Sequence, residues 1–312
     1  MTAPPALVFD LGGTQMRAAL VSHEGKIIAA HTAPTPARSG VGPVVQGLVD
    51  LATRAMAGAP RPEVAGICAP GPLDAKRGIM IAPPTLLGWK DVPISALLAA
   101  ELRLPVMMEN DANAAAIGEA VSGAGRGLAS LVFLTISTGI GAGIVIDGEI
   151  LRGRHGLAGE VGHMKITEDG PLCLCGSHGC FEALASGTAL GWRMARMTGD
   201  GVAPTGQQVA EAARAGDPAA LTAIHAHGQA LGRGFSNLLH LLSPDALVIG
   251  GGLSQAFDLL APAIMEELSH SAMPPYRDTP ILLAELGGAA GLHGMAHLLQ
   301  AHKQHIGRGE NV

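Results

Sequence analysis

Three of the four cysteines lie in one short segment, which is the strongest local chemical signal in the chain. Cys173-Leu-Cys-Gly-Ser-His-Gly-Cys180 places thiols at 173, 175 and 180, and His163 lies ten residues upstream. Three thiolates and one imidazole form a tetrahedral donor set that suits structural Zn²⁺ with no open position. His178 is a competing ligand that we rank below His163. A disulfide or free thiols are the alternatives, but clustered cysteines without an expected export signal favour a metal.

Two carboxylates flank this donor set. Glu160 lies three residues before His163, and Glu182 follows the last cysteine by two residues. If the metal is bound, both carboxylates are held beside it and can accept hydrogen bonds from a polyol. The alternative is that both are ordinary surface residues, which is the default for glutamate.

A second polar group, Glu109-Asn110-Asp111-Ala-Asn113, opens an alanine-rich segment. Asn and Asp are favoured helix N-caps, which accounts for one polar residue but not for three at the end of a strand. A carboxylate here can accept the proton of a hydroxyl whose oxygen attacks a γ-phosphoryl group, a reaction that depends on positioning and charge neutralisation. A helix N-terminus also favours an ionised Asp. We therefore expect Asp111 to act as a general base.

Glycine-rich segments follow predicted strands at three places, 10–14, 135–143 and 250–252. In the first, the backbone N–H groups of Gly12 and Gly13 and the hydroxyl of Thr14 can approach a phosphate, and Asp10 is placed to hold Mg²⁺ directly or through water. In the second, glycines at alternate positions indicate close approach of a ligand or another backbone. A hairpin turn and a tight sheet corner are the structural alternatives. The chain contains no Walker A motif, which excludes a P-loop enzyme.

The elements that must position these residues follow a repeated plan. We expect strands and helices in the order of the following ranges: strands 6–10, 17–21 and 27–31, helix 41–57, strand 63–68, helix 95–102, strand 105–108, helix 112–121, strands 130–136 and 144–146, strand 246–249 and helix 290–302. A strand runs into a glycine turn three times, and twice a hairpin follows. This predicts a duplicated α/β fold with a cleft between its halves.

Composition excludes several classes of protein. The chain of 312 residues is 48% hydrophobic and 15% charged, so disorder is not expected. The net charge of −6 and the lack of a basic stripe argue against a nucleic-acid partner. Residues 128–146 contain no charged side chain and are long enough for a membrane helix. Their Ser, Thr and Gly content instead favours two buried strands around a glycine turn. We expect no signal peptide and no membrane association.

Seven motifs together resemble the ROK family of sugar kinases (repressor, open reading frame, kinase), and most of all its bacterial glucokinase branch. The likeness extends from Asp10 to the 287–294 region. The motifs are Asp-x-Gly-Gly-Thr-x-x-Arg at 10–17, Pro-Gly-Pro at 70–72, Gly-Trp-x-x-Val-Pro at 88–93, Glu-Asn-Asp-x-Asn at 109–113, Ser-Thr-Gly-x-Gly-x-Gly at 137–143, Gly-x-Ala-Gly-Glu-x-Gly-His at 156–163 and Cys-x-Cys-Gly-x-x-Gly-Cys-x-Glu at 173–182.

The resemblance implies an actin-like (ribonuclease H-like) fold of two domains that close over ATP and a hexose, often as a cytoplasmic homodimer. It implies Asp111 as catalytic base, and Asn110, Asp111, Glu160, His163 and Glu182 as sugar contacts. His163 would share its ring nitrogens between the sugar and Zn²⁺, with Cys173, Cys175 and Cys180 as the other metal ligands. The expected nucleotide and Mg²⁺ residues are Asp10, Gly12, Gly13, Thr14, Arg17, Thr138, Gly139, Gly250, Gly251 and Gly252.

Two points bear on substrate and domain limits. Thr85 stands where the family usually carries an Asn that contacts a sugar hydroxyl, so glucose competes with N-acetylmannosamine, N-acetylglucosamine and fructose as the expected substrate. A non-catalytic sugar sensor is the alternative outside enzymes, but we expect no DNA-binding module ahead of the first strand at Ala6. We expect one domain at 1–112 plus 290–312, and a second at 113–289 with the zinc loop.

Overall fold

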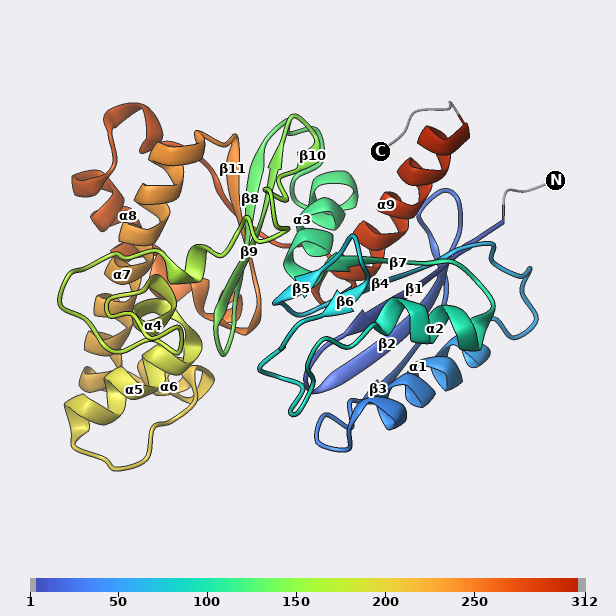
Figure 1. Cartoon of the computed structure of the whole chain (residues 1–312). Coiled ribbons are helices and arrows are strands. Elements are labelled where there is room, and N and C mark those ends of the chain that lie inside the picture. Colours follow the sequence, from blue (N-terminus) through green and yellow to red (C-terminus); the bar gives the residue numbers. More distant parts are fainter. Residues whose placement is uncertain (1–3, 308–312) are drawn as a thin grey trace. The chain divides into compact units, whose positions relative to one another are not determined.

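The computed structural model describes residues 4–307, and these form two compact units (Figure 1). The first unit contains the residues up to Gly127, Glu149–Ala158 and the residues from Gly288 onward. The second unit contains Leu128–Gly148 and Gly159–Gly287.

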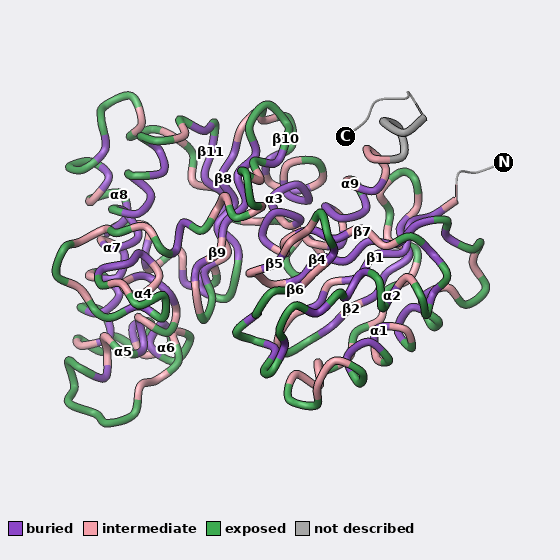
Figure 2. Tube along the Cα trace, in the orientation of Figure 1, coloured by how far each residue is buried: buried purple, intermediate pink, exposed green. Residues whose placement is uncertain are grey.

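The first unit is built on a sheet with the strand order β3-β2-β1-β4-β7. Strand β1 pairs antiparallel with β2 and parallel with β4, and β4 pairs parallel with β7. Figure 2 shows β1 and β4 buried along most of their length. The strands are β1 (Ala6–Leu11), β2 (Gln15–Val21), β3 (Ile27–Pro34), β4 (Ala65–Ala69) and β7 (Val106–Asn110), and the short strands β5 (Leu73–Asp74), β6 (Ile79–Met80) and β10 (Glu149–Ile150) also belong to this unit.

Both faces of this sheet are covered, and successive side chains of β1 point to opposite faces. Leu7 and Phe9 point into a core that includes residues of α1 (Val41–Ala55) and α2 (Ile94–Leu102). Val8 belongs to the core on the other face, with residues of α9 (Ala290–Gly307) (Figure 1). The apolar run Ala6–Phe9 of β1 is therefore explained by burial on both sides.

Helices α3 (Asp111–Ser122) and α9 approach each other at glycine positions. A Cβ atom at Gly118 would overlap the carbonyl oxygen of Ala290, and one at Gly294 would overlap the carbonyl oxygen of Ala114. The absence of these side chains lets the two backbones pack closely. Residues 113–127 and 149–158 therefore belong to the first unit, although they were predicted to lie in the second domain.

The second unit repeats the strand plan of the first. Strand β8 (Leu131–Ile136) pairs antiparallel with β9 (Ile140–Ile146) and parallel with β11 (Ala246–Gly250), which pairs parallel with β12 (Ile281–Leu283). This is the pattern of β1, β2, β4 and β7, so the expected duplication is confirmed. One core joins β8 and β11 to the helices α4 (Phe181–Ala185), α5 (Gly187–Thr198), α6 (Gly206–Arg214), α7 (Pro218–Leu242) and α8 (Phe257–Ser271).

The glycine-rich segment after β8 differs from its prediction. Residues 137–143 were expected to form a turn, but strand β9 already begins at Ile140 and the turn is confined to the residues before it. Gly141 and Gly143 lie opposite Thr135 and Phe133 in the β8–β9 ladder. Glycine at these two strand positions therefore leaves space beside the side chains of Thr135 and Phe133. The uncharged stretch in this region forms two strands, and no described helix has the length and hydropathy of a membrane span.

Candidate active site

Asp10 and Arg17 face each other across the β1–β2 hairpin of the first unit. Arg17 Nη1 donates a hydrogen bond to Asp10 Oδ2 at 2.6 Å, and Arg17 Nη2 donates to Gln15 Oε1 at 3.1 Å. Burial raises the pKa of Asp10, and the neighbouring Arg17 guanidinium offsets part of that rise. The hairpin thus holds a carboxylate at the end of a strand, partly neutralised by its own arginine.

The turn of this hairpin lies directly against Thr85. Gly12 N–H donates to Gln15 O at 2.9 Å, and the Thr35 hydroxyl donates to Gly12 O at 2.7 Å. A Cβ atom at Gly13 would come within 2.6 Å of Thr85 Cβ, so a larger residue would not fit there. The exposed Thr14 completes the turn. The structure therefore brings Thr85, a predicted sugar contact, next to a predicted phosphate-binding glycine.

Cys68 lies buried beside Asp10. The thiol is fully buried and donates to Phe9 O at 3.3 Å, with Asp10 Oδ1 at 3.8 Å. Burial raises the pKa of Cys68, and the negative charges of Asp10 and Asp111 raise it further. Cys68 is therefore a neutral core thiol, and the carboxylates of Asp10 and Asp111 both act on it.

Asp111 is the first residue of α3, at the point where β7 ends. Asn110 is the N-cap: its Oδ1 accepts hydrogen bonds from the backbone N–H groups of Ala112 at 2.9 Å and Asn113 at 3.1 Å. The carboxylate of Asp111 accepts from Ala112 N–H at 2.8 Å. Helix capping and a charged functional group were alternatives for this segment in the sequence. In the structure Asn110 caps the helix and the neighbouring Asp111 supplies the charged group.

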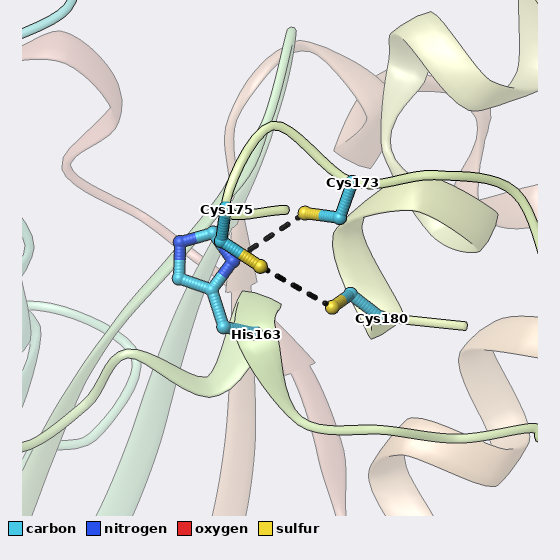
Figure 3. Close-up of side chains that lie close together, drawn as sticks. All are labelled: His163, Cys173, Cys175 and Cys180. Carbon is cyan, nitrogen blue, oxygen red and sulfur yellow. Dashed lines mark hydrogen bonds between the residues drawn. The ribbon is translucent and has the colours of Figure 1, made fainter. Parts of the chain in front are cut away.

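The second unit brings the four predicted zinc ligands together (Figure 3). The donor atoms of His163, Cys173, Cys175 and Cys180 all lie within 4.8 Å of one another. Cys175 Sγ and Cys180 Sγ are 3.7 Å apart, and His163 Nδ1 is 3.6 Å from Cys173 Sγ. A tetrahedral Zn²⁺ with ordinary bond lengths would separate two sulfurs by about 3.8 Å and a nitrogen–sulfur pair by about 3.6 Å. The donor set therefore fits this ion.

The two ring nitrogens of His163 face different groups. Nδ1 faces the thiols, whereas Nε2 lies 4.0 Å from Glu160 Oε2. His178, the competing ligand, does not belong to the metal group, and its Nδ1 is hydrogen-bonded to Gly170 O at 3.0 Å. A metal on Nδ1 would leave the Nε2 side of His163 and the half-exposed Glu160 available to a polar ligand.

Two glycine turns of the second unit are joined through Ser137, and Thr138 in the first of them contacts Thr188 of α5. Ser137 Oγ accepts a hydrogen bond from Gly252 N–H at 3.0 Å, and the Thr188 hydroxyl donates to Thr138 O at 2.8 Å. Gly251 has a φ of +83°, and a Cβ atom there would come within 2.5 Å of Ile136 O. The turns at 137–139 and 250–252, which the resemblance assigned to nucleotide binding, therefore lie side by side.

These turns form one wall of a cavity of about 840 Å³. Thr138 and Gly252, two predicted nucleotide-binding residues, line this cavity. Trp192 lines it as well and was not predicted. The indole of Trp192 is the one large aromatic group in the lining, and 56% of the residue is exposed. The lining residues are Ser137, Thr138, Gly187, Thr188, Trp192, Gly201, Val202, Ala203, Pro204, Thr205, Gly206, Gln207, Ala210, Glu211, Arg214, Gly252, Leu253, Gln255 and Ala256.

Comparison with known proteins places the chain in a family. The ROK family model matches residues 7–302. The glucokinase of Thermotoga maritima is 35% identical over 311 residues, covering 96% of this chain and 97% of that protein. A crystal structure of the ROK hexokinase from Thermus thermophilus is 34% identical, with a TM-score of 0.83 over 96% of this chain and 99% of that one. A crystal structure of a ROK family glucokinase from Streptomyces griseus, in complex with glucose and AMPPNP, is 35% identical with a TM-score of 0.76, covering 94% of this chain and 98% of that one. The chain therefore belongs to the ROK family and has the actin-like fold of its sugar kinases.

Proposed function

We propose that this chain is an ATP-dependent hexokinase that phosphorylates the 6-hydroxyl of a glucose-like sugar, with Asp111 as general base. The observation that carries the proposal is the placement of Asp111. It occupies the first turn of α3, where the Asn110 cap and the Ala112 N–H fix its surroundings. The likeness to glucokinases over nearly the whole chain supports the choice of sugar and phosphoryl donor.

In this proposal Asp111 accepts the proton of the 6-hydroxyl while that oxygen attacks the γ-phosphoryl group. Such a reaction leaves little covalent chemistry to the protein, which contributes by positioning the reacting groups and neutralising their charge. The positive end of the α3 dipole favours the carboxylate form of Asp111. Asn110 caps the helix and directly precedes the base in the chain, and its side-chain amide suits a contact to a sugar hydroxyl.

Of the remaining sugar contacts of the proposal, His163, Glu160 and Glu182 lie at or beside the zinc group, whereas Thr85 belongs to the first unit. Zn²⁺ would be held by His163, Cys173, Cys175 and Cys180, where it supplies a closed structural clamp. With Nδ1 of His163 turned to the thiols, its Nε2 and the carboxylate of Glu160 are the groups left for sugar hydroxyls. Thr85, next to Gly13, offers a hydroxyl near the phosphate turn.

The nucleotide is assigned to the cavity and the glycine turns. A cavity of about 840 Å³ with the indole of Trp192 in its lining suits an adenosine moiety, since ligand sites are lined mainly by apolar and aromatic side chains with a few polar groups. Backbone N–H groups of the two glycine turns suit phosphates. Asp10 fits Mg²⁺, because its carboxylate lies at a strand end and retains some exposure. Mg²⁺ would supply charge neutralisation on the phosphates. A homodimer and a cytoplasmic location stay predictions of the family resemblance.

The test is a coupled ADP-release assay with ATP·Mg²⁺ and glucose, mannose, fructose, N-acetylglucosamine or N-acetylmannosamine. Wild-type protein should turn over a glucose-like hexose, and product analysis should place the phosphate on the 6-hydroxyl. Asp111→Asn should lower kcat by about 10² to 10⁴, the usual contribution of a general base, without loss of nucleotide binding. Asp278→Asn, at an exposed aspartate, is the control. No turnover with any sugar, or normal turnover in Asp111→Asn, would refute the proposal or its base.

A further inference from the structure

An ion pair with one buried partner lies next to the turn that carries Asp111. Arg152 Nε donates a hydrogen bond to Glu109 Oε2 at 2.8 Å. The Glu109 side chain is only 5% exposed, whereas that of Arg152 is 40% exposed. Arg152 lies in the segment Glu149–Ala158, which belongs to the first unit together with β7 and α3. A carboxylate buried to this degree is costly unless a charged partner compensates it.

The other oxygen of Glu109 holds both sides of the Asp111 turn. Glu109 Oε1 accepts hydrogen bonds from the backbone N–H of Asn110 and from the side-chain amide of Asn113, each at 3.0 Å. Asn110 precedes Asp111, and Asn113 follows it within the first turn of α3. The Glu109 carboxylate therefore clamps the residues on either side of the base, and Arg152 occupies the oxygen that the clamp leaves free.

Arg152 also organises its own segment. Its backbone oxygen accepts a hydrogen bond from Ala158 N–H at 3.1 Å, so the chain between them closes into a compact loop. Gly153 and Gly156 within this loop have φ values of +68° and +72°, which lets the backbone reverse over few residues. The side chain of Arg152 is thus presented to Glu109 by a fixed backbone, not by a free loop.

We propose that Arg152 is a positioning residue of the phosphoryl-transfer reaction, acting through Glu109 on Asp111. The inference rests on the proposed function. With Arg152 present, both Glu109 oxygens are engaged and the turn keeps one geometry. With Arg152 removed, the buried carboxylate has only neutral donors, so it rotates toward water and releases Asn110 and Asn113. Asp111 then loses its fixed direction, and a base displaced by about 1 Å costs up to about 10² in rate.

The experiment measures kcat and both KM values for Arg152→Ala, normalised to nucleotide-binding stoichiometry so that unfolded protein is not counted. We expect kcat to fall about 10- to 100-fold while the KM for ATP stays near the wild-type value. Arg152→Lys keeps a cation in reach of Glu109 and should recover a large part of kcat. Arg154→Ala is the matched control, since Arg154 is an exposed arginine of the same segment.

The outcomes separate the inference from the proposed function. A wild-type protein without turnover on any sugar refutes the proposed function. An active wild type together with normal kcat in Arg152→Ala refutes the inference alone, as does an equal loss in Arg154→Ala. If Arg152→Ala does not fold, Arg152→Gln decides: it keeps a neutral donor of similar reach, and it should fold with a reduced kcat, whereas a wild-type kcat would overturn the role of the charge.

Discussion

Glu182 Oε2 accepts a hydrogen bond from the backbone N–H of Ile140 at 2.8 Å. Glu182 follows the last cysteine of the zinc group, and Ile140 is the first residue of β9 after the glycine turn. The contact is close enough that a Cβ atom at Gly139 would overlap the same carboxylate oxygen. One carboxylate therefore links the proposed metal clamp to the proposed phosphate turn.

We predict that Glu182→Gln raises the KM for ATP as well as the KM for sugar. The substitution replaces a charged acceptor beside Gly139 by a neutral amide, and a hydrogen bond to a charged group contributes about 1.5–3 kcal/mol. An increase of about tenfold or more in the KM for ATP is expected, measured with sugar saturating. Glu168→Gln, at an exposed glutamate of the same region, is the control. A rise in the sugar KM alone would show that the Ile140 contact has no part in nucleotide binding.

Metal analysis should find Zn²⁺ bound to the purified protein in equimolar amount. Cys175→Ser should lose the metal, because the remaining donors leave one corner of the tetrahedron without a thiolate. The sugar KM should rise in the same variant, since His163 and Glu160 then lose their fixed positions. Cys68→Ala should keep the metal, because Cys68 is not part of the donor group. Full metal content in Cys175→Ser would contradict the assignment.

The zinc group and the Asp111 turn were predictable because their residues are close in sequence. Spacing alone predicts that the three cysteines lie together. The structure then distinguishes the two candidate histidines, because His163 joins the donor group whereas His178 is hydrogen-bonded to Gly170 O. The strands were found where apolar runs are buried on both faces, as in β1. Chemistry that depends on local pattern therefore needs little tertiary information.

Arg152 was missed because its partner Glu109 is 43 residues away and no local pattern marks it. The helices α5 to α8, and with them the cavity, were not predicted either. Local signals for two of them exist: Thr205 and Gln208 form a capping box before α6, and Asp217 caps α7 with proline at its first position. The cavity itself has no such signal, because its wall assembles from segments that only the tertiary fold brings together.

Nucleotide binding should change the fluorescence of Trp192. The chain has two tryptophans, and Trp89 is buried with 4% exposure whereas Trp192 lines the cavity. Addition of ATP or a non-hydrolysable analogue should alter the emission, and Trp192→Phe should abolish the change. Trp192→Ala should raise the KM for ATP several-fold, since base–aromatic stacking contributes about 1–3 kcal/mol. Trp89→Phe is the control and should keep the response. A response that persists in Trp192→Phe would place the nucleotide elsewhere.

The stability of the protein should fall as pH decreases below about 6.5 because of His227. His227 is fully buried in α7, and burial, with a smaller effect of Arg193, lowers its pKa to about 3. Between pH 6.5 and about 3 the unfolded chain binds a proton that the folded chain excludes, so the free energy of unfolding decreases as pH falls through this window. Above pH 6.5 His227 is neutral in both states and the effect vanishes.

From pH 7 to pH 5 this histidine should therefore remove about 2 kcal/mol of unfolding free energy, from 1.5 pH units at about 1.36 kcal/mol each. Urea unfolding followed by circular dichroism at both pH values gives the difference. His227→Leu should lose that part of the pH dependence, because leucine fills the site without a titrating group. His225→Gln, two residues earlier on the same helix and half-exposed beside Glu266, should retain it. Equal pH slopes for wild type and His227→Leu would show that His227 is protonated in the folded protein, in conflict with its burial.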